Sequence, residues 1–323
     1  MSYADQVFKE MCENIIENGT DTKGELVRPK WSDGTSAYTI KQFGVVNRYD
    51  LRKEFPALTF RKTALKSAMD EILWIWQKKS NNINDLNSHI WDEWADENGS
   101  IGKAYGYQLG LKHPYKDVTE ENARKVFGNN IGIMYIGDRV DINSIPITKR
   151  FHIIEDRDNP IWYMDQVDRV LYDLKVNPFS RRILTSIYNH ADLSEMALSP
   201  CCWSVTLNVT QSADGLVLNM MLTQRSQDIL AANNWNVCQY SILLMMLAQV
   251  SGMIPGELVH CIADAHIYDR HVPIVKDLIK RESLPAPKVY LNPDVKDFYA
   301  FTTKDLIVED YKYGPQVEIP IAI

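Results

Sequence analysis

The sequence is poor in cysteine. Its 323 residues include five cysteines, an odd number, and none of them forms a Cys-x-x-Cys pair. Secreted disulfide frameworks and zinc clusters depend on such pairs, so the count disfavours both classes. The amino-terminal residues also lack a basic region followed by an apolar run, so no secretory signal is expected. These absences favour a reducing compartment, and we expect a cytoplasmic protein.

Long apolar runs and an excess of positive charge are also missing. The longest apolar run, Ile242–Ala248, is much shorter than the roughly 20 residues that span a bilayer. The net charge is −7 and the isoelectric point is near 5.6, whereas a nucleic-acid-binding domain is usually basic. We therefore expect neither a membrane protein nor a dedicated nucleic-acid binder.

What is present is an ordinary globular composition. Hydrophobic residues make up 45% of the chain and charged residues 24%, as is typical of globular proteins. Apolar residues at helical or alternating spacing indicate where the helices and strands lie. We expect helices at 4–17, 63–79, 161–176, 235–250 and 269–281, and strands at 183–188, 203–209, 216–222 and 257–263.

The order of these elements predicts the fold class. Helices and strands do not alternate strictly, so we expect an α/β or α+β fold with a mixed sheet. No stretch has the composition of a linker, and we expect one large domain over residues 1–323. Residues 111–160 are charged and loop-like with short β-prone runs, and we interpret them as an insertion.

Side chains that can take part in catalysis or ligand binding lie close together in the last third of the sequence. A thiol, a guanidinium beside a hydroxyl, a carboxylate, an amide and an imidazole–phenol pair follow one another within about seventy residues. Together they can hold a small phosphorylated molecule and attack it with sulfur. They are Cys201, Arg225, Ser226, Asp228, Asn236, His266 and Tyr268.

The sulfur is the candidate nucleophile, although a free cysteine is more commonly an inert core residue. Cys201 precedes an expected strand, and it needs nearby positive charge to form a thiolate at neutral pH. Arg225 and the Arg181-Arg182 pair are candidates for that charge. If the pair lies in a strand its side chains diverge, and a solvated basic patch is the simpler interpretation.

The amide and the imidazole–phenol pair also have two interpretations. Asn236 can read the edge of a uracil, or it can cap the helix that we expect it to open. His266 and Tyr268 share one face if extended and can then bind a sugar hydroxyl, or they can bond to backbone. His266 and His271 are five residues apart, which disfavours a zinc site on one helix face.

A carboxylate lies within an otherwise apolar helix. Glu71 belongs to the expected helix at 63–79. It lies either on the solvent face or in the core, where burial would raise its pKa and suit it to proton transfer. Trp91 and Trp94 are more often core residues than ligand platforms.

Together these segments resemble the thymidylate synthase family. The resemblance runs from about Arg28 to the carboxyl terminus. It implies a mixed, mostly antiparallel sheet packed against helices, in a homodimer that associates through its sheets. Its specific segments are Glu71-Ile72-Leu73-Trp74, Ile90–Trp94 with Gly102 and Tyr105-Gly106, Ser180-Arg181-Arg182, Met196–Cys201, Gln224–Asp228 with Asn236 and Tyr240, Asp264–Tyr268, and Pro320–Ile323.

The resemblance implies a methyltransferase that converts dUMP to dTMP. 5,10-Methylenetetrahydrofolate would supply the one-carbon unit and the hydride and leave as dihydrofolate, with no metal. Cys201 would add to C6 of the uracil, so that C5 can attack the folate's methylene group. Tyr105, and Glu71 through ordered water, would manage proton transfers at C5 and around O4.

The resemblance also implies how the substrates are held. Arg28, Arg225 and Ser226 would bind the phosphate, together with Arg181 and Arg182 from the partner subunit. Asn236 would recognise the uracil, and His266 and Tyr268 would bind the ribose. Asp228 would bind the pterin, with further folate contacts from Trp91 and Trp94. The tail that contains Ala322 would close over the ligands. Asp228 and Asn236 would also act in catalysis.

The chain departs from the family pattern at four places. Cys202 follows Cys201 where the family usually has His, and Ala263 precedes Asp264 where Gly is usual. Residues 231–236 read Ala-Ala-Asn-Asn-Trp-Asn instead of Leu-Gly-x-Pro-Phe-Asn, on the folate side of the site. Pro-Lys instead of Thr-Gly follows Arg28, in the phosphate loop.

Three other functions compete with this interpretation. The altered residues 231–235 are compatible with a dUMP hydroxymethylase, in which water instead of hydride captures the methylene carbon. A cytidylate-specific relative is less favoured, because Asp at position 236 would suit cytosine better than Asn236 does. The third alternative is a non-catalytic nucleotide- or RNA-binding module. It would not explain why Cys201, Glu71 and Tyr105 occur together, and the negative net charge disfavours it.

Overall fold

A computed structural model describes residues 1–128, 131–135, 150–154 and 161–322. The chain forms two compact units. Unit 1 comprises Met1–Met69, Cys201–Trp203 and Val217–Ile323, and unit 2 comprises Asp70–Pro200 and Ser204–Leu216. The prediction of one domain over the whole chain, with an insertion at 111–160, stays a prediction.

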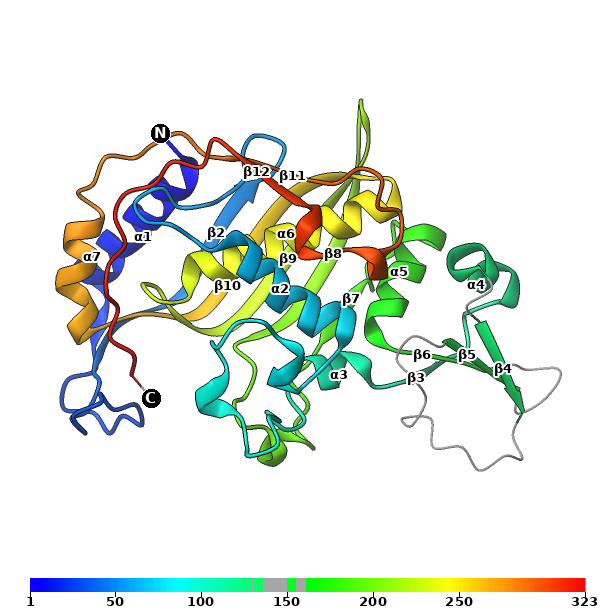
Figure 1. Cartoon of the computed structure of the whole chain (residues 1–323), viewed down its shortest axis with the longest axis horizontal. Helices are drawn as coiled ribbons and strands as arrows, with labels where there is room; N and C mark the ends of the chain where they lie inside the picture. Colours follow the sequence, from blue (N-terminus) through cyan, green and yellow to red (C-terminus); the bar gives the residue numbers. More distant parts are fainter. Residues whose placement is uncertain (129–130, 136–149, 155–160, 323) are drawn as a thin grey trace. The chain divides into compact units, whose positions relative to one another are not determined.

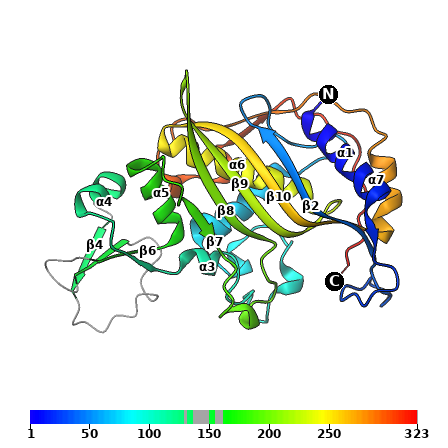
Figure 2. The same ribbon diagram turned by 180° about the vertical axis from the view of Figure 1, so that it is seen from behind.

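Unit 1 is built on a mixed sheet (Figure 2). The strand β10 (Ile254–Tyr268) lies between β2 (Thr39–Asp50) and β9 (Gly215–Asp228), antiparallel to β2 and parallel to β9. The short β1 (Thr20–Asp21) adds to β2 in antiparallel direction. The expected α/β fold with a mixed, mostly antiparallel sheet is confirmed.

Helices cover this sheet (Figure 1). The α6 helix (Asn233–Ser251) is apolar on almost every side and packs against β10, as a fully buried helix must. It ends at Gly252, whose φ of 69° only glycine adopts readily. The α1 helix (Tyr3–Asn18) and the α7 helix (Val272–Leu278) share one apolar cluster with strand residues.

Unit 2 contains a helical part and a second sheet. The α2 helix (Leu65–Leu73), which begins in unit 1, continues as a π-helical turn. The second sheet has the strand order β3-β6-β5-β4, and β7 pairs antiparallel with β8. The elements are Trp74–Lys78 (π), α3 Gly106–Gly110, α4 Glu120–Phe127, α5 Gln166–Val176, β3 His113–Tyr115, β4 Ile131–Tyr135, β5 Arg150–Ile154, β6 Ile161–Met164, β7 Leu184–Ser186 and β8 Cys202–Ser212.

Three expectations about local structure are wrong in part. Residues 161–164 are strand β6, and the helix begins only at Gln166 because the Asp165 side chain caps it by accepting from the Asp168 N–H. Asn236 does not open α6, which begins three residues earlier. The expected helix at 269–281 is a 3₁₀ turn, Asp269–His271, followed by the short α7.

Candidate active site

One end of the unit 1 sheet brings the candidate residues together. Strands β9 and β10 are parallel, so their carboxyl ends lie at the same edge of the sheet. Ser226 lies beside Asp264 in the register of this pair, and Asp228 lies beside His266. The edge where parallel strands end is a common place for ligand sites.

The thiol of Cys201 lies next to this edge. The Arg225 backbone N–H donates to the Cys201 carbonyl oxygen over 2.9 Å. Burial raises the pKa of the Cys201 thiol, while the positive charges of Arg225 and Arg28 lower it. The charge of Arg225 acts on the sulfur in the expected direction, and its role in catalysis stays a prediction. Cys201 is half-buried and Cys202, at the start of β8, is buried, so the two thiols differ in access.

The amide of Asn236 is held by a chain of hydrogen bonds that the sequence did not predict. Burial lowers the pKa of His260 to about 3, so its imidazole is neutral. Its Nε2 lies 2.8 Å from Oε1 of Gln224, which can only accept, so Nε2 carries the proton. Gln224 Nε2 in turn donates to the Ser226 carbonyl at 3.0 Å and to Asn236 Oδ1 at 3.3 Å. This sequence of donors and acceptors fixes the orientation of the side-chain amides of Gln224 and Asn236.

The imidazole–phenol pair has the extended geometry that was expected. His266 and Tyr268 lie in β10, two residues apart, with ring centroids separated by 5.1 Å. Nδ1 of His266 lies 2.8 Å from Asp264 Oδ1, which orients the ring. Burial raises the pKa of Tyr268 to about 12, so the phenol keeps its proton and can donate a hydrogen bond at neutral pH.

The carboxylate of Asp228 ends β9 and organises the loop before α6. Its Oδ1 accepts from the backbone N–H groups of Leu230 and Ala231, at 3.0 Å each. In the first turn of α6 the buried Asn234 Oδ1 accepts from Leu58 N at 3.0 Å, and Nδ2 donates to the Pro56 carbonyl at 2.9 Å. These bonds order the altered segment 231–235 without the family's Gly and Pro.

The loop that carries Arg28 is fastened by a tryptophan. Trp31, only 3% exposed, donates from Nε1 to Asp269 Oδ1 at 3.0 Å. The guanidinium of Arg270 lies 4.9 Å from the Trp31 ring centroid and donates to Asp33 at 2.6 Å. These contacts connect the loop to the residues that follow Tyr268.

A second group of candidate residues lies in unit 2. Glu71 is 6% exposed and accepts from Trp91 Nε1 at 2.8 Å. The Trp91 ring packs edge-on against Tyr105 at 4.9 Å and against the half-buried Trp94 at 5.7 Å. Of the two interpretations of Glu71, the structure shows the buried one, with an indole as hydrogen-bond donor.

The position of Tyr105 depends on a close backbone approach. Tyr105 has a φ of 47°, in a region that side chains other than glycine rarely adopt. A Cβ atom on the next residue, Gly106, would lie 2.3 Å from the Ser80 carbonyl oxygen. Only glycine therefore fits at Gly106. This contact with the backbone just after the π-helical turn holds the strained Tyr105 in place.

The two arginines between α5 and β7 lie in a different local structure from the one expected. Arg181 and Arg182 lie in a turn before β7, not in a strand, and both are exposed. The argument that strand geometry separates their side chains therefore does not apply. Their exposure leaves them accessible to another molecule.

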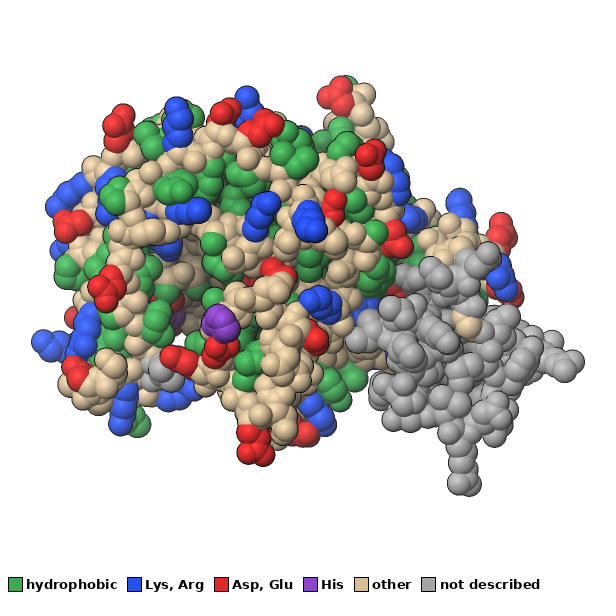
Figure 3. Space-filling model, viewed as in Figure 1, with side chains coloured by type: hydrophobic (Ala, Val, Ile, Leu, Met, Phe, Trp, Pro, Cys, Tyr) green, Lys and Arg blue, Asp and Glu red, His purple; other side chains and the backbone are tan. Residues whose placement is uncertain are grey.

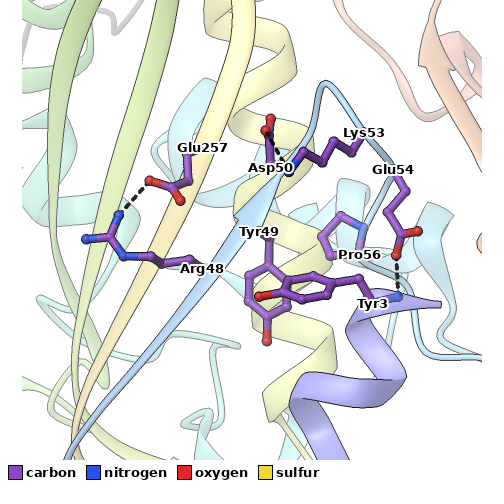
Figure 4. A pocket seen from close by; sticks show the side chains of 8 residues that line it. All are labelled: Tyr3, Arg48, Tyr49, Asp50, Lys53, Glu54, Pro56 and Glu257. Carbon is purple, nitrogen blue, oxygen red and sulfur yellow. Dashed lines mark hydrogen bonds and ion pairs between the residues drawn. The ribbon is translucent and has the colours of Figure 1, made fainter.

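A cavity of about 320 Å³ lies at the opposite end of β10 from His266 and Tyr268 (Figure 4). Its lining includes Glu257 and Asp50, which pair at one end of β10 and β2, whereas Tyr268 and Thr39 pair at the other end. Eleven residues at about 3.3 Å each separate the two ends, roughly 35 Å. Figure 4 also shows that the polar groups of the cavity are paired with one another, so this cavity is not the candidate site.

The described residues contain no group of three or more His, Cys, Asp or Glu side chains that could hold a metal ion. Within the same residues, no helix is long and apolar enough to cross a membrane. On the face shown in Figure 3, acidic and basic side chains are interspersed.

The fold and the site define a class. An α/β protein that brings a thiol, a guanidinium, an amide and a phenol to one sheet edge has the residue types of a group-transfer enzyme. The thymidylate synthase family model matches residues 6–323. The chain belongs to the thymidylate synthase family, and it is a methyltransferase.

Similar proteins cover the chain from end to end. A thymidylate synthase of Bacillus licheniformis is 38% identical, and thymidylate synthase 1 of Bacillus subtilis (strain 168) is 37% identical, each over 100% of both chains. Among solved structures, thermostable thymidylate synthase A from Bacillus subtilis superposes with a TM-score of 0.80 at 36% identity, again over 100% of both chains.

Proposed function

We propose that this enzyme performs its family's reaction through Cys201. In this reaction dUMP and 5,10-methylenetetrahydrofolate give dTMP and dihydrofolate. The Cys201 sulfur bonds to C6 of the uracil, and the bond breaks again when the product leaves. The observation that carries the proposal is the hydrogen-bonded arrangement around Gln224–Asp228, which places Cys201, Asn236 and His266 next to one strand end.

The nucleotide is proposed to bind along this strand end. Arg225, Ser226 and Arg28 hold the phosphate, because a guanidinium fork and a hydroxyl match its oxygens. The positive charge of Arg28 and Arg225 already acts on the Cys201 thiol, which supports their placement near the reacting sulfur. His266 and Tyr268 bind the ribose 3′-hydroxyl from the same face of β10.

Asn236 is proposed to select uracil. Its amide can donate to O4 and accept from N3–H of the ring, which cytosine does not match. The chain of bonds from His260 through Gln224 supports this role, because it holds the amide in one orientation.

Glu71 and Tyr105 are proposed to handle protons during the reaction, Glu71 through ordered water. The Trp91 indole that donates to Glu71 holds its carboxylate in one place. Tyr105 is fixed by its strained backbone and by the Trp91 ring. Both side chains are therefore preorganised, as general acid–base groups need to be.

The folate is a substrate that brings the methylene carbon and the hydride. Trp91 and Trp94 offer aromatic faces for it, and Asp228 offers a carboxylate for the pterin N–H groups. Asp228 fits this role because its carboxylate is held in one orientation. Its Oδ1 accepts from the backbone N–H groups of Leu230 and Ala231. The tail that contains Ala322 closes over the ligands and excludes water.

We also propose a homodimer in which Arg181 and Arg182 complete the phosphate site of the partner. Their exposure supports it. A cytoplasmic location is proposed because the five cysteines are all free.

The hydroxymethylase alternative is not favoured. The relatives described above are thymidylate synthases, and segment 231–235 is ordered by Asn234 and Asp228 despite its altered sequence. An assay decides between the two outcomes. Purified enzyme with dUMP and methylenetetrahydrofolate should form dihydrofolate and dTMP in equal amounts. Hydroxymethyl-dUMP with unoxidised tetrahydrofolate would overturn the proposal.

Cys201→Ser separates an enzyme from a pure binder. Loss of the thiolate should lower kcat by at least about 10³-fold, because the hydroxyl is a far weaker nucleophile at neutral pH. Binding of dUMP should stay within a few-fold of the original protein. A Cys202→Ser variant is the matched control and should keep most of its turnover.

A further inference from the structure

The carboxyl-terminal segment is fastened to unit 1 along most of its length. It follows β12 (Leu306–Glu309), is drawn as the red end of the ribbon in Figure 1, and is hydrogen-bonded to residues 58–63. Tyr311 donates to the Leu58 carbonyl at 2.8 Å, Gly314 N–H to the Thr59 carbonyl at 2.8 Å, and Gln316 to the Lys62 carbonyl at 2.9 Å. This part of the tail has its own anchors.

The last anchor is a histidine that the reaction scheme above does not use. Nε2 of His271 lies 2.7 Å from the Pro320 carbonyl oxygen. A carbonyl can only accept, so Nε2 carries a proton in any protonation state of the ring. Only three residues follow Pro320, and Ile321 among them is already 49% exposed. His271 therefore holds the tail at the point where the terminal residues begin.

The other side of the same ring faces the proposed pterin ligand. His271 Nδ1 lies 3.5 Å from Asp228 Oδ1. The imidazole is fully buried, and the rings of Trp31 and Tyr268 pack edge-on against it at 5.7 and 5.4 Å. Buried between two aromatic walls, the ring has little freedom to turn away from either partner.

The charged groups around the ring favour its protonated form. Asp228 at the end of β9 and Asp269 in the preceding 3₁₀ turn both raise the pKa of His271, and burial opposes them. Arg270 lies over the Trp31 ring, 4.9 Å from its centroid, and its charge is engaged by Asp33. The net direction is a raised pKa.

We propose that His271 is a positioning residue that connects the carboxyl-terminal tail to Asp228, with Nε2–H on the Pro320 carbonyl and Nδ1 on the Asp228 carboxylate. Through it, one side chain lies between the group proposed to hold the pterin and the segment proposed to close over it, with a hydrogen bond on the tail side and an ion-pair contact of 3.5 Å on the Asp228 side. The inference rests on the proposed function, since it assigns those roles to Asp228 and the tail. His271 thereby favours folate binding and leaves dUMP binding unchanged.

Three variants test the link. His271→Phe keeps the ring packing and removes both polar contacts, whereas His271→Gln keeps a donor for Pro320. His113→Phe, in strand β3 of unit 2, is the matched control. We expect His271→Phe to raise KM for methylenetetrahydrofolate about tenfold with a smaller change in kcat and an unchanged dUMP Kd. His271→Gln should recover part of that loss, and His113→Phe should show none.

A second readout does not depend on turnover. Carboxypeptidase should release the terminal residues several-fold faster from His271→Phe than from the original protein, because the last anchor is gone. If the original protein makes no dTMP, the proposed function fails, while this trimming rate still tests the link. If His271→Phe does not fold, His271→Gln and His271→Asn carry the test, since Asn keeps only the donor toward Asp228.

The pH dependence gives a third readout. Because the pKa of His271 is raised in the folded protein, the charged link is complete at low pH and is lost as pH rises through that pKa. KM for folate should therefore rise with pH in the original protein, and this step should be absent in His271→Gln. Unchanged KM and unchanged trimming in His271→Phe, or an equal loss of dUMP affinity, would overturn the inference.

Discussion

At the scale of the residue, the reactivity of Cys201 is a balance between burial and charge. Burial disfavours the thiolate, and the guanidinium groups of Arg225 and Arg28 favour it. Burial outweighs the two charges, and the pKa is raised. The two guanidinium groups make this rise smaller than burial alone would make it.

This balance predicts the effect of removing one charge. In Arg225→Ala the pKa of Cys201 should rise further, so alkylation of Cys201 by iodoacetamide at neutral pH should slow by several-fold to about tenfold. Peptide mass spectrometry at a series of pH values measures the rate at Cys201 alone. Arg124→Ala, which removes a surface guanidinium of unit 2, should leave the rate unchanged. A faster or unaltered rate in Arg225→Ala would contradict the assigned balance.

At the scale of the element, one buried carboxylate joins three segments of unit 2. Asp165 Oδ2 accepts from Lys79 at 2.6 Å and from Lys112 at 2.8 Å, and all three side chains are almost fully buried. Its other oxygen caps α5 by accepting from the Asp168 N–H at 2.9 Å. Lys79 directly follows the π-helical turn, so Asp165 fixes the end of that turn.

Neutralising this carboxylate should therefore be costly. In Asp165→Asn two buried ammonium groups lose their counter-charge, and breaking a buried ion pair commonly costs about 3–5 kcal/mol. We expect the midpoint of thermal unfolding to fall by roughly 5–10 °C in differential scanning calorimetry. Asp117→Asn, at a carboxylate that is 65% exposed, should change it by no more than about 2 °C. Equal effects of the two variants would rule out the special role of Asp165.

The spacing of apolar residues predicted the helices whose signal lies within their own sequence. The helices at 4–17 and 235–250 and the turn at Gly252 are confirmed to within a few residues. The start of the helix predicted at 161–176 was missed because β6 is defined by pairing with β3 and β5, which local spacing does not encode.

The candidate site was predictable only where side chains carry recognisable chemistry. Cys201 and Arg225 were predicted to act together, and both lie at the strand end. His260, His271 and Trp31 were not predicted to act there. Their roles depend on partners between 36 and 238 residues away in the chain, and no local signal marks such contacts.

At the scale of the whole molecule, the proposed homodimer adds Arg181 and Arg182 of one copy to the proposed phosphate site of the other. A cyclic dimer of this kind repeats the same site twice. Arg181 and Arg182 are exposed, as residues that reach another chain must be before association.

Mixing two inactive variants tests the shared site. Cys201→Ser lacks the nucleophile, and the Arg181→Ala/Arg182→Ala double variant lacks the arginines. In a mixed dimer one site receives Cys201 from one chain and both arginines from the other. After unfolding and refolding an equal mixture, turnover should recover to about a quarter of the original specific activity. Each variant refolded alone should stay inactive, and no recovery in the mixture would show that the arginines act within their own chain.

The most direct measurement concerns the bond between sulfur and pyrimidine. The enzyme incubated with 5-fluoro-dUMP and methylenetetrahydrofolate should be trapped as a covalent complex, since fluorine at C5 blocks the proton removal that releases product. Digestion and tandem mass spectrometry should then place the added mass of nucleotide and folate on Cys201. An adduct on Cys202 or on another residue, or no adduct at all, would contradict the account.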